Sequence, residues 1–353
     1  MTKPGHLMLI ASAFAALAQP AAAQTFEGKT IRLVINFGVG GPLDGFMRAF
    51  TPYIEQHLPG RPTIVAENRP GAAGRVGASY LYNVAKPDGL TIGGMVGVPN
   101  DALFGLETKY DPAKFTWLGA TPQTQVTLVR TDLRVKTPAD LLKPARPLVM
   151  AGTGANSNDH IATTLALRMM GVSFQSVHGY AGQAATVHAI RQGEANMTDA
   201  GAPFYLPNRE SWAKEGLFLP VLQRGDLGAD GNFSRSPLIP DVPTMPEAIS
   251  AMNPDALRSV DFAAYRLIAG TYALQYSIIA PPGVPDDIAA ALRKAVAAAF
   301  NDPRAIADVK RKMSLEYNYL DGPEAKKVYE TLAKEARANP AARDLVAKMI
   351  EIK

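Results

Sequence analysis

The stretch IRLVINFGVGGPLDGFMRAFTPYIEQHL (residues 31–58) joins a buried strand to an amphipathic helix through a glycine-rich turn. Apolar side chains that include Phe46, Phe50 and Ile54 follow the turn with a helical period. Glycine lets the backbone approach a ligand closely, and the first turn of a helix favours an anion. The stretch therefore predicts an α/β fold with an anion-binding loop where the strand ends.

The turn is not a nucleotide-binding motif. Leu43 stands where the third glycine of G-x-G-x-x-G belongs, and the Lys-Ser/Thr pair of a P-loop is missing. Asp44 has two interpretations that stay open, because it could contact a ligand or act only as a helix cap.

The N-terminal segment, residues 1–23, has the pattern of a secretory signal. Its apolar run, Leu7–Ala18, is shorter than the roughly 20 residues that span a bilayer. Small residues follow it, so we expect cleavage between Ala23 and Gln24 and export to the periplasm.

Composition excludes several classes of function. The 353 residues carry a formal charge of only +4, which argues against a nucleic-acid partner. Cysteine is absent, so disulfides and thiolate sites are impossible. The chain has neither a G-x-S-x-G elbow nor an H-E-x-x-H helix. We therefore expect no metal, no cofactor and no catalytic residue.

Strand and helix patterns alternate along the chain and predict two α/β units. The last strand and helices, from about residue 263, are expected to return to the first unit. The predicted domains are residues 24–124 with 263–353 and residues 125–262. Two chain crossings would form a hinge, with a ligand cleft between the domains.

Three more glycine-rich loops follow predicted strands: ENRPGAAGRVG (67–77), AGTGANSND (151–159) and HGYAGQA (178–184). Ligands of α/β sheets bind at the carboxyl ends of the strands, so the four loops indicate one cleft. The third loop carries Thr153, Asn156 and Ser157, short side chains that hydrogen-bond carboxylates without bringing charge.

The motifs KTIRLVINFGVGGPLD, VAENRPGAAGRVG, GTGANSNDHIA, VHGYAGQAATVHAIRQGEANM, IPDVPTMPEAI and IIAPPGVPDDIAAALRKAV occur in this order. Together they resemble the extracytoplasmic solute receptors of tripartite tricarboxylate transporters, the Bug family. The resemblance implies a type II-like periplasmic-binding-protein fold. It also implies a receptor that captures a small carboxylate (a di- or tricarboxylate, a hydroxyacid or an aromatic acid) for the membrane permease subunits, acting as a monomer.

The resemblance also implies a set of ligand-binding residues. They are Phe37, Gly40, Gly41, Asp44, Thr153, Asn156, Ser157, Tyr180, Gly182 and Asp199.

The sequence departs from the family pattern at several places. Ala151-Gly152 replaces a common alanine-serine, and His178-Gly179-Tyr180 replaces valine-proline-tyrosine. Arg75 stands where a small or amide residue is common, either as a second carboxylate's partner or as a surface residue. The segment 211–276 is longer and more divergent.

Two other functions stay open. The protein could be a secreted hydrolase that uses Asp44 and Asp199 as an acid–base pair. It could also be a ligand sensor for a signalling partner.

Overall fold

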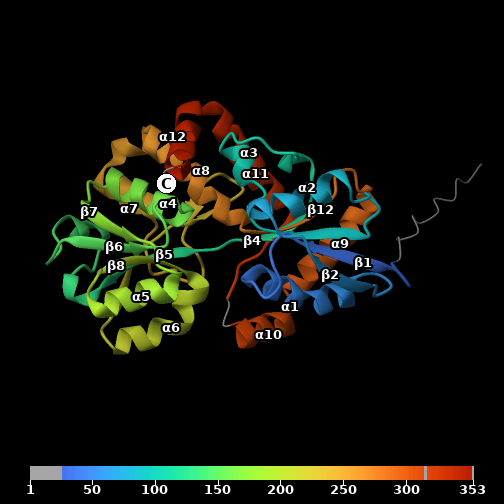
Figure 1. Ribbon diagram of the computed structural model, residues 1–353, viewed down its shortest axis with the longest axis horizontal. Coiled ribbons are helices and arrows are strands. Elements are labelled where there is room, and N and C mark those ends of the chain that lie inside the picture. The colour runs from blue at the N-terminus through green and yellow to red at the C-terminus, as the bar shows by residue number, and fades with distance from the viewer. Residues whose placement is uncertain (1–25, 314–315, 352–353) are drawn as a thin grey trace, which may run out of the picture.

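The computed structural model describes residues 26–313 and 316–351, so the predicted export signal lies outside the described residues. Two β-sheets lie side by side, and helices cover both faces of each (Figure 1). Within the described residues, no helix is both long and apolar enough to span a bilayer.

The first sheet has six strands in the order β13-β4-β12-β3-β1-β2. Its strands are β1 (Thr30–Ile35), β2 (Thr63–Asn68), β3 (Thr91–Met95), β4 (Thr116–Thr121), β12 (Tyr276–Ala280) and β13 (Leu320–Asp321). Strand β1 pairs in parallel with β2 and β3, as the strand–helix–strand pattern predicts, whereas β12 runs antiparallel between β3 and β4.

The second sheet has five strands in the order β7-β6-β8-β5-β9. Its strands are β5 (Gln125–Arg130), β6 (Leu148–Gly152), β7 (Phe174–His178), β8 (Met197–Gly201) and β9 (Phe218–Gln223). Strands β6, β7 and β8 are parallel, and β5 is antiparallel to both β8 and β9. Both sheets are therefore mixed.

The helices of the first half are α1 (Pro42–His57), α2 (Arg75–Asn83), α3 (Asn100–Leu103), α4 (Asn158–Met169), α5 (Gln183–Gln192) and α6 (Ala202–Lys214). Those of the second half are α7 (Met245–Met252), α8 (Val260–Thr271), α9 (Asp286–Phe300), α10 (Pro303–Met313), α11 (Gly322–Ala338) and α12 (Pro340–Glu351). Short 3₁₀ turns cover Ala72–Gly74, Pro112–Lys114, Thr131–Leu133, Pro138–Leu142, Pro254–Arg258 and Tyr272–Leu274.

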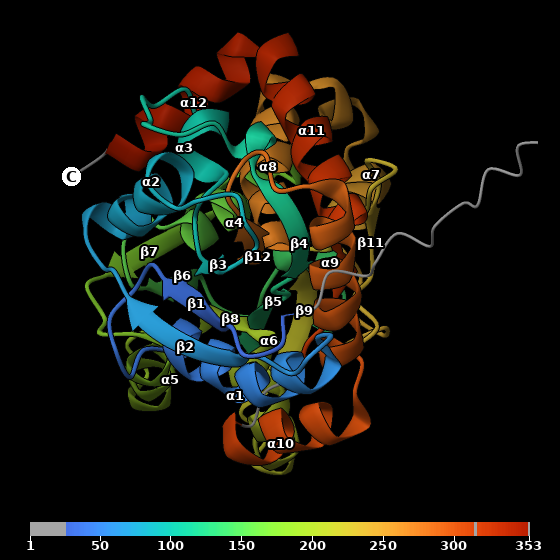
Figure 2. The ribbon, with the colours of Figure 1, turned by 90° about the vertical axis from the view of Figure 1, so that its right-hand side faces the viewer.

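Alternation along β1 explains how the first sheet is covered. Ile31, Leu33 and Ile35 are buried with α1 and α9, whereas Val34 packs on the other side with Leu81 of α2. Successive side chains of a strand point to opposite faces, so each face needs its own helices. Figure 2 shows α1 and α10 below β1 and β2, with α2 and α3 above them.

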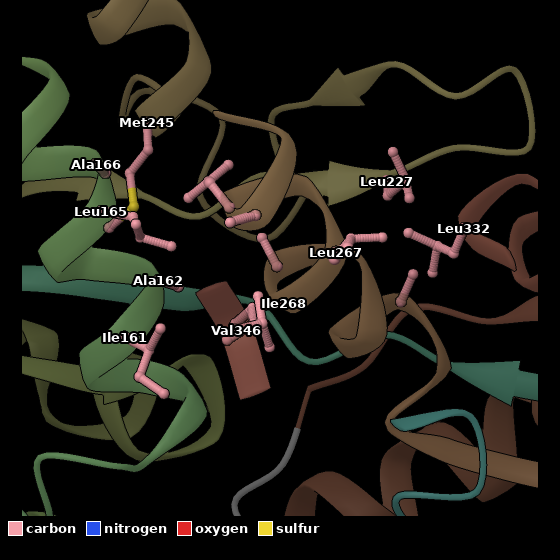
Figure 3. Close-up of a cluster of buried hydrophobic side chains, with 14 of the residues drawn as sticks. Ile161, Ala162, Leu165, Ala166, Leu227, Met245, Leu267, Ile268, Leu332 and Val346 are labelled. Atoms are coloured by element: carbon pink, nitrogen blue, oxygen red, sulfur yellow. The ribbon is translucent and has the colours of Figure 1, made fainter. Parts of the chain in front are cut away.

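The second sheet follows the same rule. Val126 and Leu128 of β5 are buried with α5 and α6, and Val129 joins the cluster that contains α4, α7 and α8. Within that cluster Figure 3 shows Ile161 and Leu165 of α4 together with Ile268 of α8.

The chain passes from the first sheet to the second between β4 and β5, and it returns to the first at β12. Helix α8 packs on α4 as well as on α11 and α12. One hydrophobic cluster is therefore continuous from the first sheet to the second. The division into residues 24–124 with 263–353 and residues 125–262 stays a prediction.

One local expectation needs correction: the glycines, prolines and aspartates of residues 224–245 predict a loop. The segment contains the short hairpin β10 (Asp226–Leu227) and β11 (Phe233–Ser234), since Leu227 and the ring of Phe233 find apolar partners on α8. Pro52 lies inside α1 without ending it.

The turn before α2 is the most strained backbone of the described residues. Gly71, Ala72, Ala73 and Gly74 have φ angles of 130°, 46°, 54° and 91°. A side chain in this region crowds the following carbonyl and costs roughly 1–2 kcal/mol, a cost that glycine avoids. The first and last positions carry glycine, whereas Ala72 and Ala73 bear the strain.

We expect Ala73→Gly to leave the free energy of unfolding unchanged or to raise it by up to about 1 kcal/mol, because relief of the strain offsets the flexibility of glycine. Urea unfolding measures the change. Ala290→Gly is the matched control, since Ala290 is also exposed but lies inside α9. The control should lose about 0.5–1 kcal/mol. An equal loss in both variants would contradict the strain.

Candidate functional site

A cavity of about 320 Å³ opens between the two sheets. It is lined by Pro42, Gln123, Gln125, Gln183, Gly201, Pro203, Phe204, Tyr276 and Met313. Larger hollows near Arg75, Arg32 and Lys143 are each lined by residues that belong to one sheet and its helices. A solute shared by both sheets therefore fits the cavity at Gly201 best.

Three helices begin at this cavity. Pro42 is the first residue of α1, Gln183 is the first of α5, and Gly201 directly precedes α6. Each helix starts after a glycine (Gly41, Gly182 or Gly201), so no side chain caps it. Unsatisfied N–H groups and the positive ends of the helix dipoles favour an anion at such a place.

The first predicted loop is organised by Asp44. Its carboxylate accepts hydrogen bonds from the backbone N–H of Gly40 (3.0 Å), from Arg48 (2.8 Å) and from Asn68 (2.8 Å). Burial opposes ionisation, but these donors prevail and lower the pKa of Asp44. The side chain is almost fully buried, so Asp44 shapes the loop through protein contacts while Phe37 stays partly exposed.

The predicted residues of the second sheet are also held mainly by the protein. Ser157 caps α4, and Asn156 donates to the carbonyl of Ile350 in α12 (3.3 Å). The Tyr180 hydroxyl donates to Glu194 (3.0 Å), and Thr153 is exposed. None of these four lines the cavity.

None of the ten predicted ligand-binding residues lines this cavity, although two of them directly precede lining residues in the sequence. The lining residue Pro42 follows Gly41, and Gln183 follows Gly182. The three glutamines were missed, since isolated glutamines in a loop or at the start of a strand or helix have no recognisable spacing. The one available signal was their position beside predicted glycine turns and at the start of a predicted strand.

Asp199 belongs to β8, the central strand of the second sheet. Its two carboxylate oxygens accept from the hydroxyls of Thr127 and Thr163, each at 2.7 Å. Burial raises the pKa of Asp199 to about 6, although the charge of Arg224 and the two hydroxyls work against the rise. Asp199 is therefore a half-buried acid with its own donors, separate from the donors of Asp44.

Arg224, at the end of β9, is only 1% exposed. It donates to Asp159 (3.2 and 3.3 Å), and its guanidinium lies 4.1 Å from the centre of the Tyr272 ring. Its backbone N–H donates to the carbonyl of Gln125 (3.0 Å). The cluster thus connects the start of α4 to the strand end that carries a cavity residue.

Two departures from the family pattern are coupled in space. The rings of His160 and His178 meet at 4.4 Å, and the Nδ1 atoms of both are buried without a partner. A Cβ at Gly152 would lie 3.1 Å from the Nδ1 atom of His178. Gly152 therefore leaves space for the histidine at position 178.

Arg75 donates to both oxygens of Asp101 at 2.6 and 2.7 Å. The Asp101 carboxylate therefore neutralises the Arg75 guanidinium, and both residues belong to segments that pack around the first sheet. No contact in the described structure brings Arg75 to the cavity at Gly201.

The raised pKa of Asp199 predicts how stability depends on pH. The folded protein holds this proton more tightly than the unfolded chain, so this residue's contribution to stability should fall between about pH 4 and pH 6 and stay level above. We therefore compare the free energy of unfolding of Asp199→Asn with that of wild type at each pH. The value for the variant minus the value for wild type should increase from pH 4 to pH 6 by roughly 2–3 kcal/mol at most. Urea unfolding at pH 4, 5, 6 and 7 measures it.

Asp140→Asn is the control. Backbone N–H groups of Lys136 and Thr137 lower the pKa of Asp140, so it titrates below this window. Its difference from wild type should be nearly constant from pH 5 to pH 7. A constant difference for Asp199→Asn would show that Asp199 does not titrate abnormally.

No family model matches the chain. The UPF0065 protein in the gbd 5′ region of Cupriavidus necator is 29% identical over 252 residues, which are 67% of this chain and 71% of that protein.

Solved structures share the architecture over most of the chain. A TctC solute-binding protein from Polaromonas has a TM-score of 0.68 at 20% identity, covering 92% of this chain and all of the other. The periplasmic binding protein BugD has a TM-score of 0.52 at 20% identity (91% and 97% covered). MatC from Rhodopseudomonas palustris, solved with bound malate, has a TM-score of 0.51 at 22% identity (90% and 98% covered).

The predicted type II-like fold is therefore confirmed. The chain has the fold of the TctC and BugD periplasmic binding proteins.

Proposed function

We propose that this protein is a periplasmic receptor that binds a small carboxylate in the cavity at Gly201 and delivers it to the permease subunits of a tripartite tricarboxylate transporter. The observation that carries the proposal is the start of three uncapped helices, α1, α5 and α6, at one cavity. The malate bound by MatC, a protein of the same fold, supports a carboxylate as the solute.

The electrostatics of the cavity suit an anion without a salt bridge. None of the nine described residues that line it carries a formal charge at neutral pH. Backbone N–H groups at helix ends supply partial positive charge, typically stabilising an anion by 0.3–1 kcal/mol for each end. For α1 the Asp44 carboxylate already lies in the first turn. Helix α5 has no acid in its first turn. Helix α6 also has none, but it offers fewer free donors, because the N–H of Ala202 donates to the carbonyl of Thr124 and Pro203 has no N–H.

Binding without chemical conversion follows from the same residues. General acid–base catalysis needs a group whose pKa lies near the working pH and which reaches the reacting atom. Tyr276 is the one titratable side chain among the described lining residues, and burial raises its pKa further from neutrality. The receptor is therefore expected to release its solute unchanged, and the hydrolase alternative has no acid or base at the cavity.

Delivery to a transporter requires a solute that is bound by both sheets. Residues on the two sides of the cavity come from different sheets, joined by chain crossings between β4 and β5 and between β9 and β12. A solute that contacts both sides favours their approach, and the closed form would present a distinct surface to the permease.

A substitution at Gly201 tests the proposal. Gly201 has φ −64° and ψ 144°, an extended conformation that aspartate adopts readily as a helix cap. Gly201→Asp should keep or raise the free energy of unfolding by a few tenths of a kcal/mol. It should also weaken carboxylate binding roughly tenfold or more, because the new carboxylate repels the solute. Calorimetry with malate, succinate, adipate, hexanoate and benzoate measures binding.

Gly201→Asn is the matched control, since asparagine occupies nearly the same volume without the charge. Binding by Gly201→Asn should lie between wild type and Gly201→Asp. If no carboxylate binds the wild type, or if Gly201→Asp binds as tightly as wild type, the proposal is wrong.

A further inference from the structure

The cavity at Gly201 has two chemically different sides. Gln125, Gln183 and Gly201 of the second sheet form a polar side. Pro42, the ring of Tyr276 and Met313, from the elements around the first sheet, provide a mostly apolar side that Pro203 and Phe204 extend. Gln123 completes the lining, and its side chain is hydrogen-bonded to Tyr276. A solute that fills the cavity must therefore have a polar end and an apolar body.

The polar side converges on one point. The Nε2 atoms of Gln125 and Gln183 each lie 3.5 Å from the position that a Cβ of residue 201 would occupy. Because residue 201 is glycine, this position is open, and α6 begins directly behind it. The two amides thus flank the open face of Gly201, and a carboxylate in front of this face could accept hydrogen bonds from both.

Gln125 has a second feature that indicates a ligand. Its side chain is 5% exposed, and its Oε1 atom is buried without a hydrogen-bond partner. Buried polar atoms are nearly always paired, so an unpaired one needs an explanation. Oε1 only accepts hydrogen bonds and an ionised carboxylate has no donor, so a carboxylate would contact the Nε2 atom of this amide, whose orientation no hydrogen bond at Oε1 fixes.

The apolar side limits the number of charges. Tyr276 is 8% exposed and its ring packs 4.9 Å from that of Phe46, so the wall behind it is aromatic. A second carboxylate on this side would leave water without a pair of amide donors such as Gln125 and Gln183, because the Gln123 side chain already bonds Tyr276. Burial of an unpaired charge is strongly unfavourable.

We propose that the solute is a monocarboxylate with an apolar body, whose carboxylate is held by the side-chain amides of Gln125 and Gln183 at Gly201. The inference rests on the proposed receptor function and narrows its solute class. The cavity volume, about 320 Å³, lies at the lower end for small-molecule sites, which suits a short aliphatic chain or a single ring.

Hexanoate and adipate test the charge requirement, because they have the same six carbons and differ in one terminal group. Isothermal titration calorimetry on the wild-type protein is expected to give at least tenfold tighter binding for hexanoate. The ring pair benzoate and terephthalate should show the same order. Equal or tighter binding of adipate and terephthalate overturns the inference and leaves the receptor function intact. If none of the four nor malate binds, the receptor function itself fails.

Substitutions test the amide contacts. Gln183→Ala should weaken hexanoate binding by about tenfold or more, since hydrogen bonds to a charged group are strong. Gln125→Met should do the same, and the thermal midpoint identifies any variant that fails to fold. Gln192→Ala is the matched control, because Gln192 is an exposed glutamine at the other end of α5, and it should bind within twofold of wild type. If Gln183→Ala also binds within twofold, the amide contacts are excluded.

Discussion

The structure depends on a buried arginine at the point where the second sheet meets α8. A guanidinium that leaves water costs several kcal/mol unless charge and hydrogen bonds replace the solvent. Arg224 has Asp159 and the face of Tyr272 as partners, and the Tyr265 hydroxyl donates to its carbonyl. Its N–H holds the carbonyl of Gln125, so the pairing that stabilises the arginine also positions one side of the cavity.

Neutral groups line the candidate site, and none of its described lining residues can form a salt bridge. Both acids singled out by the motifs, Asp44 and Asp199, bind donors of the protein itself. Asp44 organises the first loop as an anion, whereas burial keeps Asp199 protonated to higher pH. The described lining of the cavity consists of helix starts, amides and apolar side chains, so the proposed binding there relies on geometry more than on net charge. The two acids therefore support the site without lining it.

The alternation of apolar and polar residues was sufficient for most of the fold. Residues 31–58 form strand β1 and helix α1 as their periods predict, because burial of one face is a local property of the sequence. The hairpin at Asp226–Ser234 was missed, since its strands are two residues long and depend on contacts with α8. Pro52 is tolerated within α1, so packing outweighs one lost hydrogen bond.

The sequence by itself determined the two α/β units, the glycine turns and the family resemblance. Each follows from neighbouring residues whose spacing is visible along the chain. Only the tertiary structure decided which side chains line the cavity. Gln125, Gln183 and Gly201 are up to 76 positions apart, and they meet because β5 and β8 are paired and α5 begins beside them. Their convergence depends on strand order and crossing, and the local sequence does not encode either.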